Sequence, residues 1–149
     1  MHRRRYLAAV GTAVSVGLAG CSSALSVLED DPCSGEDCHI GMSRTEFRPV
    51  SYEASVGDTV VWKNTSEADH TVTAYENLIP DAAEYFASGG YESQEAAYDA
   101  WNDEEWEERG GRLGTRDTYE HTFEVAGTYE YFCIPHEGAE MVGEVVVTE

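Results

Sequence analysis

The chain has 149 residues, which suits one domain once an N-terminal segment is set aside. Its hydrophobic content of 42 % is enough for a packed core, but 29 Asp and Glu stand against nine Lys and Arg, for a formal net charge of −20. A nucleic-acid-binding function is excluded, because no basic stripe is available to neutralise phosphates. The acids are spread along the whole sequence, which favours adaptation to high salt, as in a halophile, over attraction of a basic partner.

The first residues, 1–21, have the features of an export signal. Three arginines precede an apolar run about as long as the core of a signal peptide and shorter than a spanning helix. The arginines, followed by an aromatic residue and a leucine, resemble a twin-arginine export signal. The sequence Leu-Ala-Gly-Cys that ends at Cys21 resembles the lipobox of exported lipoproteins. We therefore expect cleavage before Cys21, its lipidation, and anchoring at the extracytoplasmic face of the cell membrane; an ordinary cleaved signal or an uncleaved anchor is the alternative.

A polar, turn-rich segment follows over residues 22–37 and predicts a tether to a folded domain over residues 38–149. Cys33 and Cys38 lie at the end of this tether and are separated by four residues. Outside the membrane, a disulfide between them is the natural interpretation. The alternative is a small metal site built from both cysteines and His39.

The domain itself is predicted to be all-β. Five segments combine β-branched and aromatic residues with turn residues on either side, as strands do. They are residues 59–64, 70–75, 118–125, 127–133 and 143–148. Short strands separated by turn residues favour a sandwich or a small barrel.

Residues 76–116 interrupt the strand pattern and predict a helical insertion of one or two short helices. Asp81 is a candidate N-cap for the first helix, because Glu84 follows three residues later as in a capping box. Gly89 is then the residue that would end this helix. The insertion is therefore predicted to contain a short helix that starts at Asp81 and ends at Gly89.

A second helix in the insertion is predicted to start after Ser93, a favourable N-cap residue. Ala97 and Trp101 are four residues apart and therefore lie on one face of this helix. We expect the helix to pack Trp101 or Trp106 on the sandwich. Alternatively, the acidic residues 103–108 could dock a basic partner.

Near the C-terminus, nine residues place a cysteine, a histidine and a methionine in one loop. Thiolate sulfur and imidazole nitrogen together select copper or zinc over hard cations. Cys133 and His136 are three residues apart, and Pro135 between them stiffens the turn. Met141 follows with a weak thioether donor. Taken singly, such residues usually belong to a core, but together they indicate a metal site.

A second histidine is needed to complete the two-histidine, one-cysteine set with a long axial methionine that is typical of blue-copper electron-transfer sites. His70 is the best candidate, because it starts a predicted strand after a turn-rich segment and can project from one end of a sandwich. His121, inside a predicted strand, and His39, next to the tether, are the alternatives.

The sequence around these residues resembles a known family. Residues 131–147, YFCIPHEGAEMVGEVVV, are similar to the copper loop of plastocyanins and of halocyanins, the blue-copper proteins of halophilic archaea. Residues 47–64, with Phe-x-Pro and Gly-Asp-Thr-Val-x-Trp-x-Asn patterns, resemble the upstream part of the same fold, and residues 69–74 resemble the segment with the first histidine. The sequence departs from plastocyanins at Asp69, where they usually have proline, and in the long acidic insertion.

The resemblance implies a Greek-key β-sandwich of the cupredoxin type that binds one type 1 copper ion. It implies His70, Cys133 and His136 as equatorial ligands and Met141 as the axial ligand, with the backbone N–H of Thr71 pointing at the cysteine sulfur. Four protein ligands leave no open position for a substrate. The expected protein is therefore a monomeric single-electron carrier, not an enzyme, and its partners are membrane or soluble redox proteins of an electron-transport chain.

In this family, the histidine that follows the cysteine lies nearest to solvent and is the expected exit for electrons. By resemblance, His136 is expected to lie within a rim of apolar residues. Ile134, Pro135, Gly138 and Ala139 are the candidates for that rim.

Two other functions stay open. A copper oxidoreductase needs a second copper site, commonly built from His-x-His pairs, and the sequence has none. A copper storage or delivery protein favours exposed, exchangeable clusters of Met or Cys, and the sequence concentrates its soft donors in a single loop. The electron carrier is therefore the favoured interpretation.

Overall fold

The structure is a computed structural model that describes residues 33, 38–103 and 109–149. The predicted export signal, with its lipobox residue Cys21, and nearly all of the predicted tether lie outside these residues. Across the part of the chain that the structure describes, no helix is both long and apolar enough to cross a membrane.

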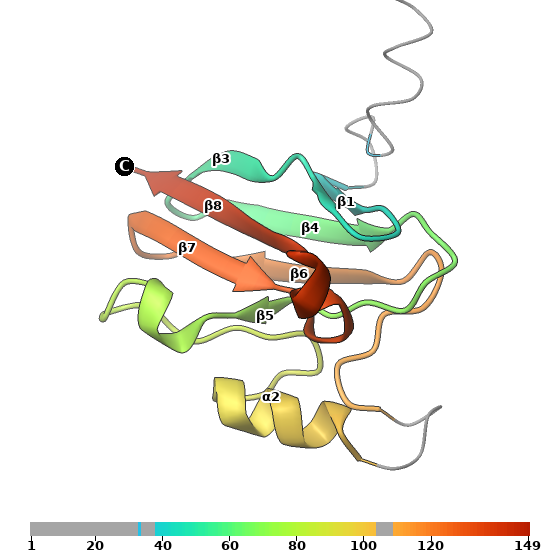
Figure 1. Ribbon diagram of the computed structural model, residues 1–149. Coiled ribbons are helices and arrows are strands. Elements are labelled where there is room, and N and C mark those ends of the chain that lie inside the picture. The colour runs from blue at the N-terminus through green and yellow to red at the C-terminus, as the bar shows by residue number, and fades with distance from the viewer. Residues whose placement is uncertain (1–32, 34–37, 104–108) are drawn as a thin grey trace, which may run out of the picture.

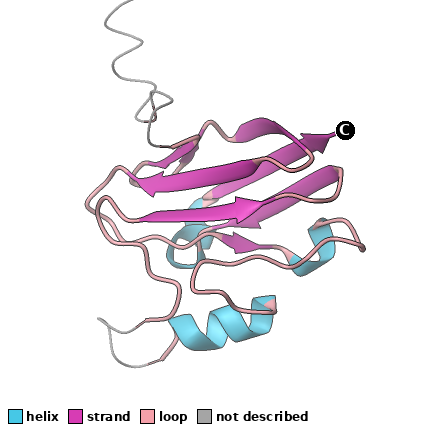
Figure 2. Cartoon of the chain, turned by 180° about the vertical axis from the view of Figure 1, so that it is seen from behind, coloured by secondary structure: helices cyan, strands magenta, loops and turns pink. Residues whose placement is uncertain are grey.

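Two four-stranded sheets pack face to face (Figures 1 and 2), with strand orders β2-β1-β4-β6 and β3-β8-β7-β5. The strands are β1 (Ile40–Met42), β2 (Phe47–Arg48), β3 (Ser51–Ser55), β4 (Thr59–Asn64), β5 (Thr73–Ala74), β6 (Thr118–Thr122), β7 (Gly127–Phe132) and β8 (Val142–Thr148). Each sheet contains one parallel pair, β1 with β4 and β3 with β8, and its other pairs are antiparallel. The predicted all-β sandwich is confirmed.

The core lies between the two sheets, and β4 shows how the sequence builds it. Side chains alternate along this strand, so that Val60, Trp62 and Asn64 are buried and their neighbours are not. The fully buried ring of Trp62 meets the ring of Tyr131 on β7 edge-on, with centroids 5.4 Å apart. Such aromatic pairs contribute about 0.5–1.5 kcal/mol beyond the burial of their area. The packing of Trp62 on Tyr131 stabilises the end of the sandwich where β4 and β7 end.

Four of the five predicted strands are found with small shifts in their bounds, as β4, β6, β7 and β8. The strand predicted over residues 70–75 is found only as β5, because the backbone groups of its first residues bond elsewhere. His70 makes only an isolated bridge to Leu113, and the backbone N–H of Thr71 donates to the sulfur of Cys133 instead of to a neighbouring strand.

The described part of the insertion contains one α-helix, α2 (Gln94–Trp101), which starts where the sequence predicts it. The Ser93 side chain caps its first turn by accepting a backbone N–H bond at 3.1 Å. Trp101 is buried, and α2 lies beside β5, an edge strand of the second sheet (Figure 1). Trp106 and the acidic residues 104–108 lie outside the described part of the chain.

The helix predicted to start at Asp81 and to end at Gly89 is wrong. After a short 3-10 helix, η1 (Glu76–Leu78), the chain continues as turns and extended backbone. Phe86 is buried in the core, and its carbonyl accepts a hydrogen bond from the N–H of Ala74 at 3.1 Å. Burial of this large ring and pairing with β5 outweigh a local capping signal worth about 1 kcal/mol.

A disulfide joins Cys33 and Cys38 at the start of the domain. Directly after it, the backbone N–H of His39 donates to the carbonyl of Val61 at 2.8 Å, and the Nδ1 atom of its ring accepts from the N–H of Val61 at 3.0 Å. These bonds hold the end of the tether against β4. The disulfide takes up both thiols that the alternative metal site would need.

Candidate metal centre

Three of the predicted ligands converge at one end of the sandwich. The Nδ1 atoms of His70 and His136 lie 3.5 Å and 3.4 Å from the sulfur of Cys133. The three donor atoms all lie within 4.8 Å of one another, and within the described residues no other set of three or more histidine, cysteine or acidic donors comes together in this way. This end of the fold therefore brings two imidazoles and one sulfur to a single point.

The loop between β7 and β8 brings the fourth predicted ligand back to the third. It contains a 3-10 helix, η3 (Ile134–Ala139), in whose first turn Pro135 fits because its backbone angle is already helical. Glu140 follows in the left-handed conformation, with a φ of 61°. The turn returns Met141 alongside Cys133, whose N–H donates to the carbonyl of Met141 at 3.0 Å. The side chain of Met141 is fully buried at this end of the core.

His70 is fixed through both its backbone and its ring. Its N–H donates to the carbonyl of Leu113 at 3.1 Å, and its carbonyl accepts from the N–H of Leu113 at 2.8 Å. The Nε2 atom of its ring lies 2.9 Å from the hydroxyl oxygen of Ser66. With the proton on Nε2, the other ring nitrogen presents its lone pair toward Cys133.

A buried asparagine at the end of β4 organises this histidine. The amide of Asn64 donates to the carbonyls of Ala68 and Leu113 at 2.6 Å and 2.9 Å. Its oxygen accepts from the backbone N–H and from the hydroxyl of Ser66, both at 2.9 Å. Because the Ser66 proton goes to Asn64, the Ser66 oxygen is left to accept from Nε2 of His70. Asn64 was not predicted to be a site residue, although it ends the Gly-Asp-Thr-Val-x-Trp-x-Asn pattern.

Thr71 connects the segment of the first histidine to the loop of the other ligands. Its backbone N–H donates to the sulfur of Cys133 at 3.4 Å, as the resemblance implied. Its hydroxyl oxygen accepts from the N–H of Ile134 at 2.9 Å and lies 3.1 Å from the hydroxyl of Thr73. A backbone donor aimed at a sulfur ligand stabilises its negative charge and so tunes the metal.

Burial disfavours charge at this cluster unless a cation is present. Burial, followed by the nearby His136, lowers the pKa of His70 to about 4, and burial also lowers the pKa of His136. Burial raises the pKa of Cys133 to about 11. Two neutral imidazoles are ready donors, and a soft metal ion supplies the positive charge that a buried thiolate requires. The residues therefore fit a copper ion.

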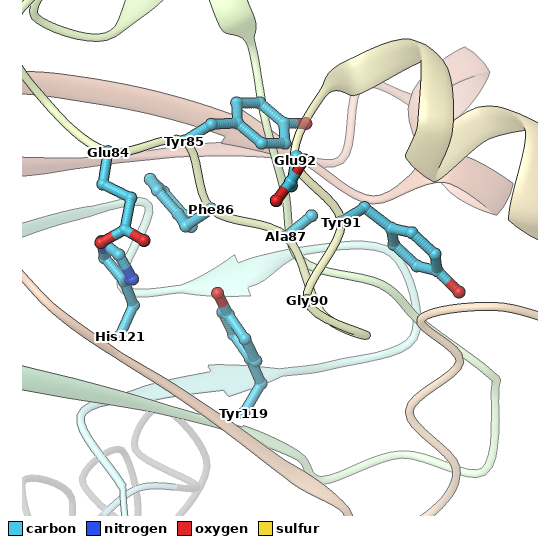
Figure 3. A pocket seen from close by; sticks show the side chains of 9 residues that line it. All are labelled: Glu84, Tyr85, Phe86, Ala87, Gly90, Tyr91, Glu92, Tyr119 and His121. Carbon is cyan, nitrogen blue, oxygen red and sulfur yellow. The ribbon is translucent and has the colours of Figure 1, made fainter.

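The alternative histidines lie elsewhere in the structure. The ring of His121 on β6 stacks on Phe86, with centroids 4.7 Å apart. It borders a cavity of about 420 Å³ together with Glu84, Tyr119 and others, none of them a predicted ligand (Figure 3). His39 is bonded to β4 as described above. His70 is therefore the histidine that the fold brings to Cys133.

Comparisons with known proteins match the part of the chain that contains the predicted ligands. Residues 37–148 match the family model described as copper binding proteins, plastocyanin/azurin family. The chain belongs to the plastocyanin/azurin family. It is 30 % identical over 138 residues to the chloroplastic plastocyanin of Tetradesmus obliquus, covering 93 % of this chain and 80 % of that protein. It is 32 % identical over 141 residues to the major plastocyanin isoform of Arabidopsis thaliana, covering 95 % and 70 %.

Solved structures of amicyanin variants share the fold of this chain. An oxidized proline-to-glycine variant gives a TM-score of 0.52 at 23 % identity, covering 78 % of this chain and 87 % of that chain. A reduced tryptophan-to-tyrosine variant gives 0.51 at 24 %, covering 75 % and 83 %. At such identities the likeness concerns the fold alone, and it confirms the predicted cupredoxin-like sandwich.

The family and the donor set together define the site. His70, Cys133, His136 and Met141 form a type 1 copper-like site, in which two nitrogens, one thiolate and one thioether match the preference of copper. The chemistry of the family is copper-based transfer of single electrons between redox proteins.

Proposed function

We propose that the protein is a membrane-tethered carrier that shuttles single electrons between redox proteins of a respiratory electron-transport chain. The buried cluster of His70, Cys133 and His136, in a chain of the plastocyanin/azurin family, is the observation that carries this proposal. Copper bound there would supply reversible Cu(I)/Cu(II) chemistry. Four donor side chains leave no open position for a substrate, which supports a carrier and not an enzyme.

The contribution of the protein is to hold the donors in place. The bonds from Asn64 through Ser66 fix the ring of His70, and Thr71 fixes its segment against the loop of Cys133. Ligands held by such networks move little when the charge of the metal changes. A small rearrangement keeps the barrier to electron transfer low.

Two measurements on copper-loaded protein test the proposed function. Voltammetry is expected to give a reversible one-electron wave, and transfer of copper to a chelator is expected to be slow because three of the four ligands are fully buried. Rapid transfer would instead indicate copper storage or delivery. Oxidation of a substrate with turnover would indicate a copper oxidoreductase.

Electrons are proposed to leave through His136, the half-buried ligand, within the apolar rim of Ile134, Pro135, Gly138 and Ala139. Ile134→Lys is expected to slow electron exchange by about tenfold, the factor that corresponds to about 1.4 kcal/mol, because a lysine at a docking surface must lose water. Exchange is measured by line broadening in mixtures of oxidised and reduced protein.

Val56→Lys is the matched control for the rim variant. Val56 is an exposed valine whose N–H donates to the carbonyl of Thr148, at the end of β8 remote from Met141. This control is expected to leave exchange unchanged. If Ile134→Lys exchanges electrons as fast as Val56→Lys, the electron exit lies elsewhere.

We also propose that the protein is exported by the twin-arginine route and is anchored by a lipid on Cys21 at the extracytoplasmic face of the membrane. The motifs within residues 1–21 support this location, and the Cys33–Cys38 disulfide suits an oxidising compartment. The net charge of −20 supports a halophilic setting, and its repulsion at lower salt supports a monomer.

Cys21→Ser tests the anchor. The variant is expected to move from the membrane fraction to the soluble fraction, because it lacks the thiol that takes the lipid. Immunoblotting of fractionated cells measures this redistribution. A variant that stays with the membrane as fully as the parent protein would rule out lipidation at this residue.

A further inference from the structure

A carboxylate next to the most accessible ligand is held by two tyrosines from outside the loop. Glu137 directly follows His136, and its Oε1 atom accepts a hydrogen bond from the hydroxyl of Tyr75 at 3.2 Å. Its Oε2 atom accepts from the hydroxyl of Tyr98 at 2.5 Å, a length typical of strong bonds to a charged oxygen. Tyr75 follows β5, whereas Tyr98 belongs to α2 of the insertion.

The same two tyrosines also pack on the other end of the ligand segment. The ring of Tyr75 stacks on Phe132, with centroids 4.3 Å apart, and the ring of Tyr98 lies 5.6 Å from it. Phe132 directly precedes Cys133, just as Glu137 directly follows His136. The tyrosine pair therefore contacts both ends of the segment that carries two of the ligands.

The hydroxyls of the pair act as donors over the ordinary pH range. Burial, with further contributions from Glu137, raises the pKa of Tyr75 and of Tyr98 to about 12. Both hydroxyls are therefore neutral, so their bonds fix the carboxylate of Glu137 without cancelling its charge.

The helix that carries Tyr98 is too short to be stable without tertiary contacts, since it spans only Gln94–Trp101. One attachment is at its start, where the side-chain oxygen of Gln94 accepts from the backbone N–H of Glu76 at 3.0 Å. The bond from Tyr98 to Glu137 is a second attachment, one turn further along. Figure 1 shows α2 beside β5, at the edge of the second sheet.

We propose that Glu137 is a positioning residue that couples α2 to the metal loop: through Tyr75 and Tyr98 it steadies His136 and fixes one negative charge beside this ligand. A fixed negative charge favours the more highly charged, oxidised ion, and so lowers the reduction potential of the site. This electrochemical effect rests on the proposed function. The coupling between the helix and the loop does not, because it is a property of the polypeptide.

Glu137→Gln and Tyr98→Phe separate the charge from the coupling. Hydrogen exchange of the α2 amides, measured on the copper-free full chain, is expected to be about tenfold faster in Tyr98→Phe, which loses a hydrogen bond to a charged group. The increase is expected to be smaller in Glu137→Gln, because the amide oxygen of glutamine still accepts from the hydroxyl of Tyr98. The reduction potential of the copper-loaded protein is expected to rise in Glu137→Gln. It is expected to rise less in Tyr98→Phe, which keeps the charge.

Glu140→Gln is the matched control, because it removes a charge from an exposed side chain of the same loop. It is expected to leave exchange of α2 unchanged and to raise the potential less than Glu137→Gln. Exchange of α2 that is unchanged in Tyr98→Phe would overturn the coupling. A rise in Glu137→Gln no larger than in Glu140→Gln would overturn the role of the fixed charge. Failure of the coupling would leave a blue copper spectrum intact, so it is distinguishable from failure of the proposed function.

Discussion

Replacement of His70 by alanine is expected to abolish the intense visible absorption and the type 1 EPR signal of the copper-loaded protein. The ring of His70 is fully buried, and its Nδ1 atom lies 3.5 Å from the sulfur of Cys133. Without it, one nitrogen donor is lost, and the space admits water as a different ligand. Absorption and EPR spectra of the variant, recorded after copper loading, measure the effect.

His121→Ala is the matched control for this loss. Its ring is half-buried against Phe86 and borders the cavity of Figure 3, so its removal is expected to alter stability but not the copper spectrum. If His121→Ala loses the type 1 signal while His70→Ala keeps it, the ligand assignment is contradicted.

Asn64→Ala is expected to lower the free energy of unfolding by about 2–4 kcal/mol, the largest loss expected here from a residue that is not a ligand. The substitution removes four hydrogen bonds of a fully buried side chain and leaves the carbonyls of Ala68 and Leu113 without these donors. It also frees Ser66, so that the ring of His70 is no longer fixed. Urea unfolding of copper-free protein at one fixed salt concentration measures the change.

Asn77→Ala serves as the comparison, because Asn77 is an exposed residue of η1. A surface substitution of this kind is expected to change the free energy of unfolding by no more than about 0.5 kcal/mol. Equal stabilities of Asn64→Ala and Asn77→Ala would show that the buried network does not support the site.

The sequence predicted those parts of the molecule that local patterns specify. Cys133, His136 and Met141 share one loop, so their spacing alone indicated a metal site. The β-branched and aromatic residues over 59–64, with turn residues on either side, likewise predicted the strand found as β4. His70 required a further argument, since it is 63 residues from Cys133 in the chain.

The predictions were wrong or incomplete where contacts between residues far apart in the sequence determine the structure. The capping signal at Asp81 is local, whereas the burial of Phe86 depends on the whole core. Burial of Phe86 outweighs the capping signal, so no helix forms at Asp81. The contacts of Glu137 with Tyr75 and Tyr98 span 62 and 39 residues of sequence. No periodicity within a strand or helix reports such pairs, so the link between the insertion and the loop became visible only in the fold.

Visible and EPR spectra of the Cu(II)-loaded protein, recorded with and without added azide, test the central claim most directly. We predict an intense thiolate-to-copper absorption and a type 1 EPR signal that azide does not change, because four donor side chains would hold the ion and three of them are fully buried. A protein that stays colourless after loading, or whose spectrum changes on adding azide, would contradict a closed electron-transfer site.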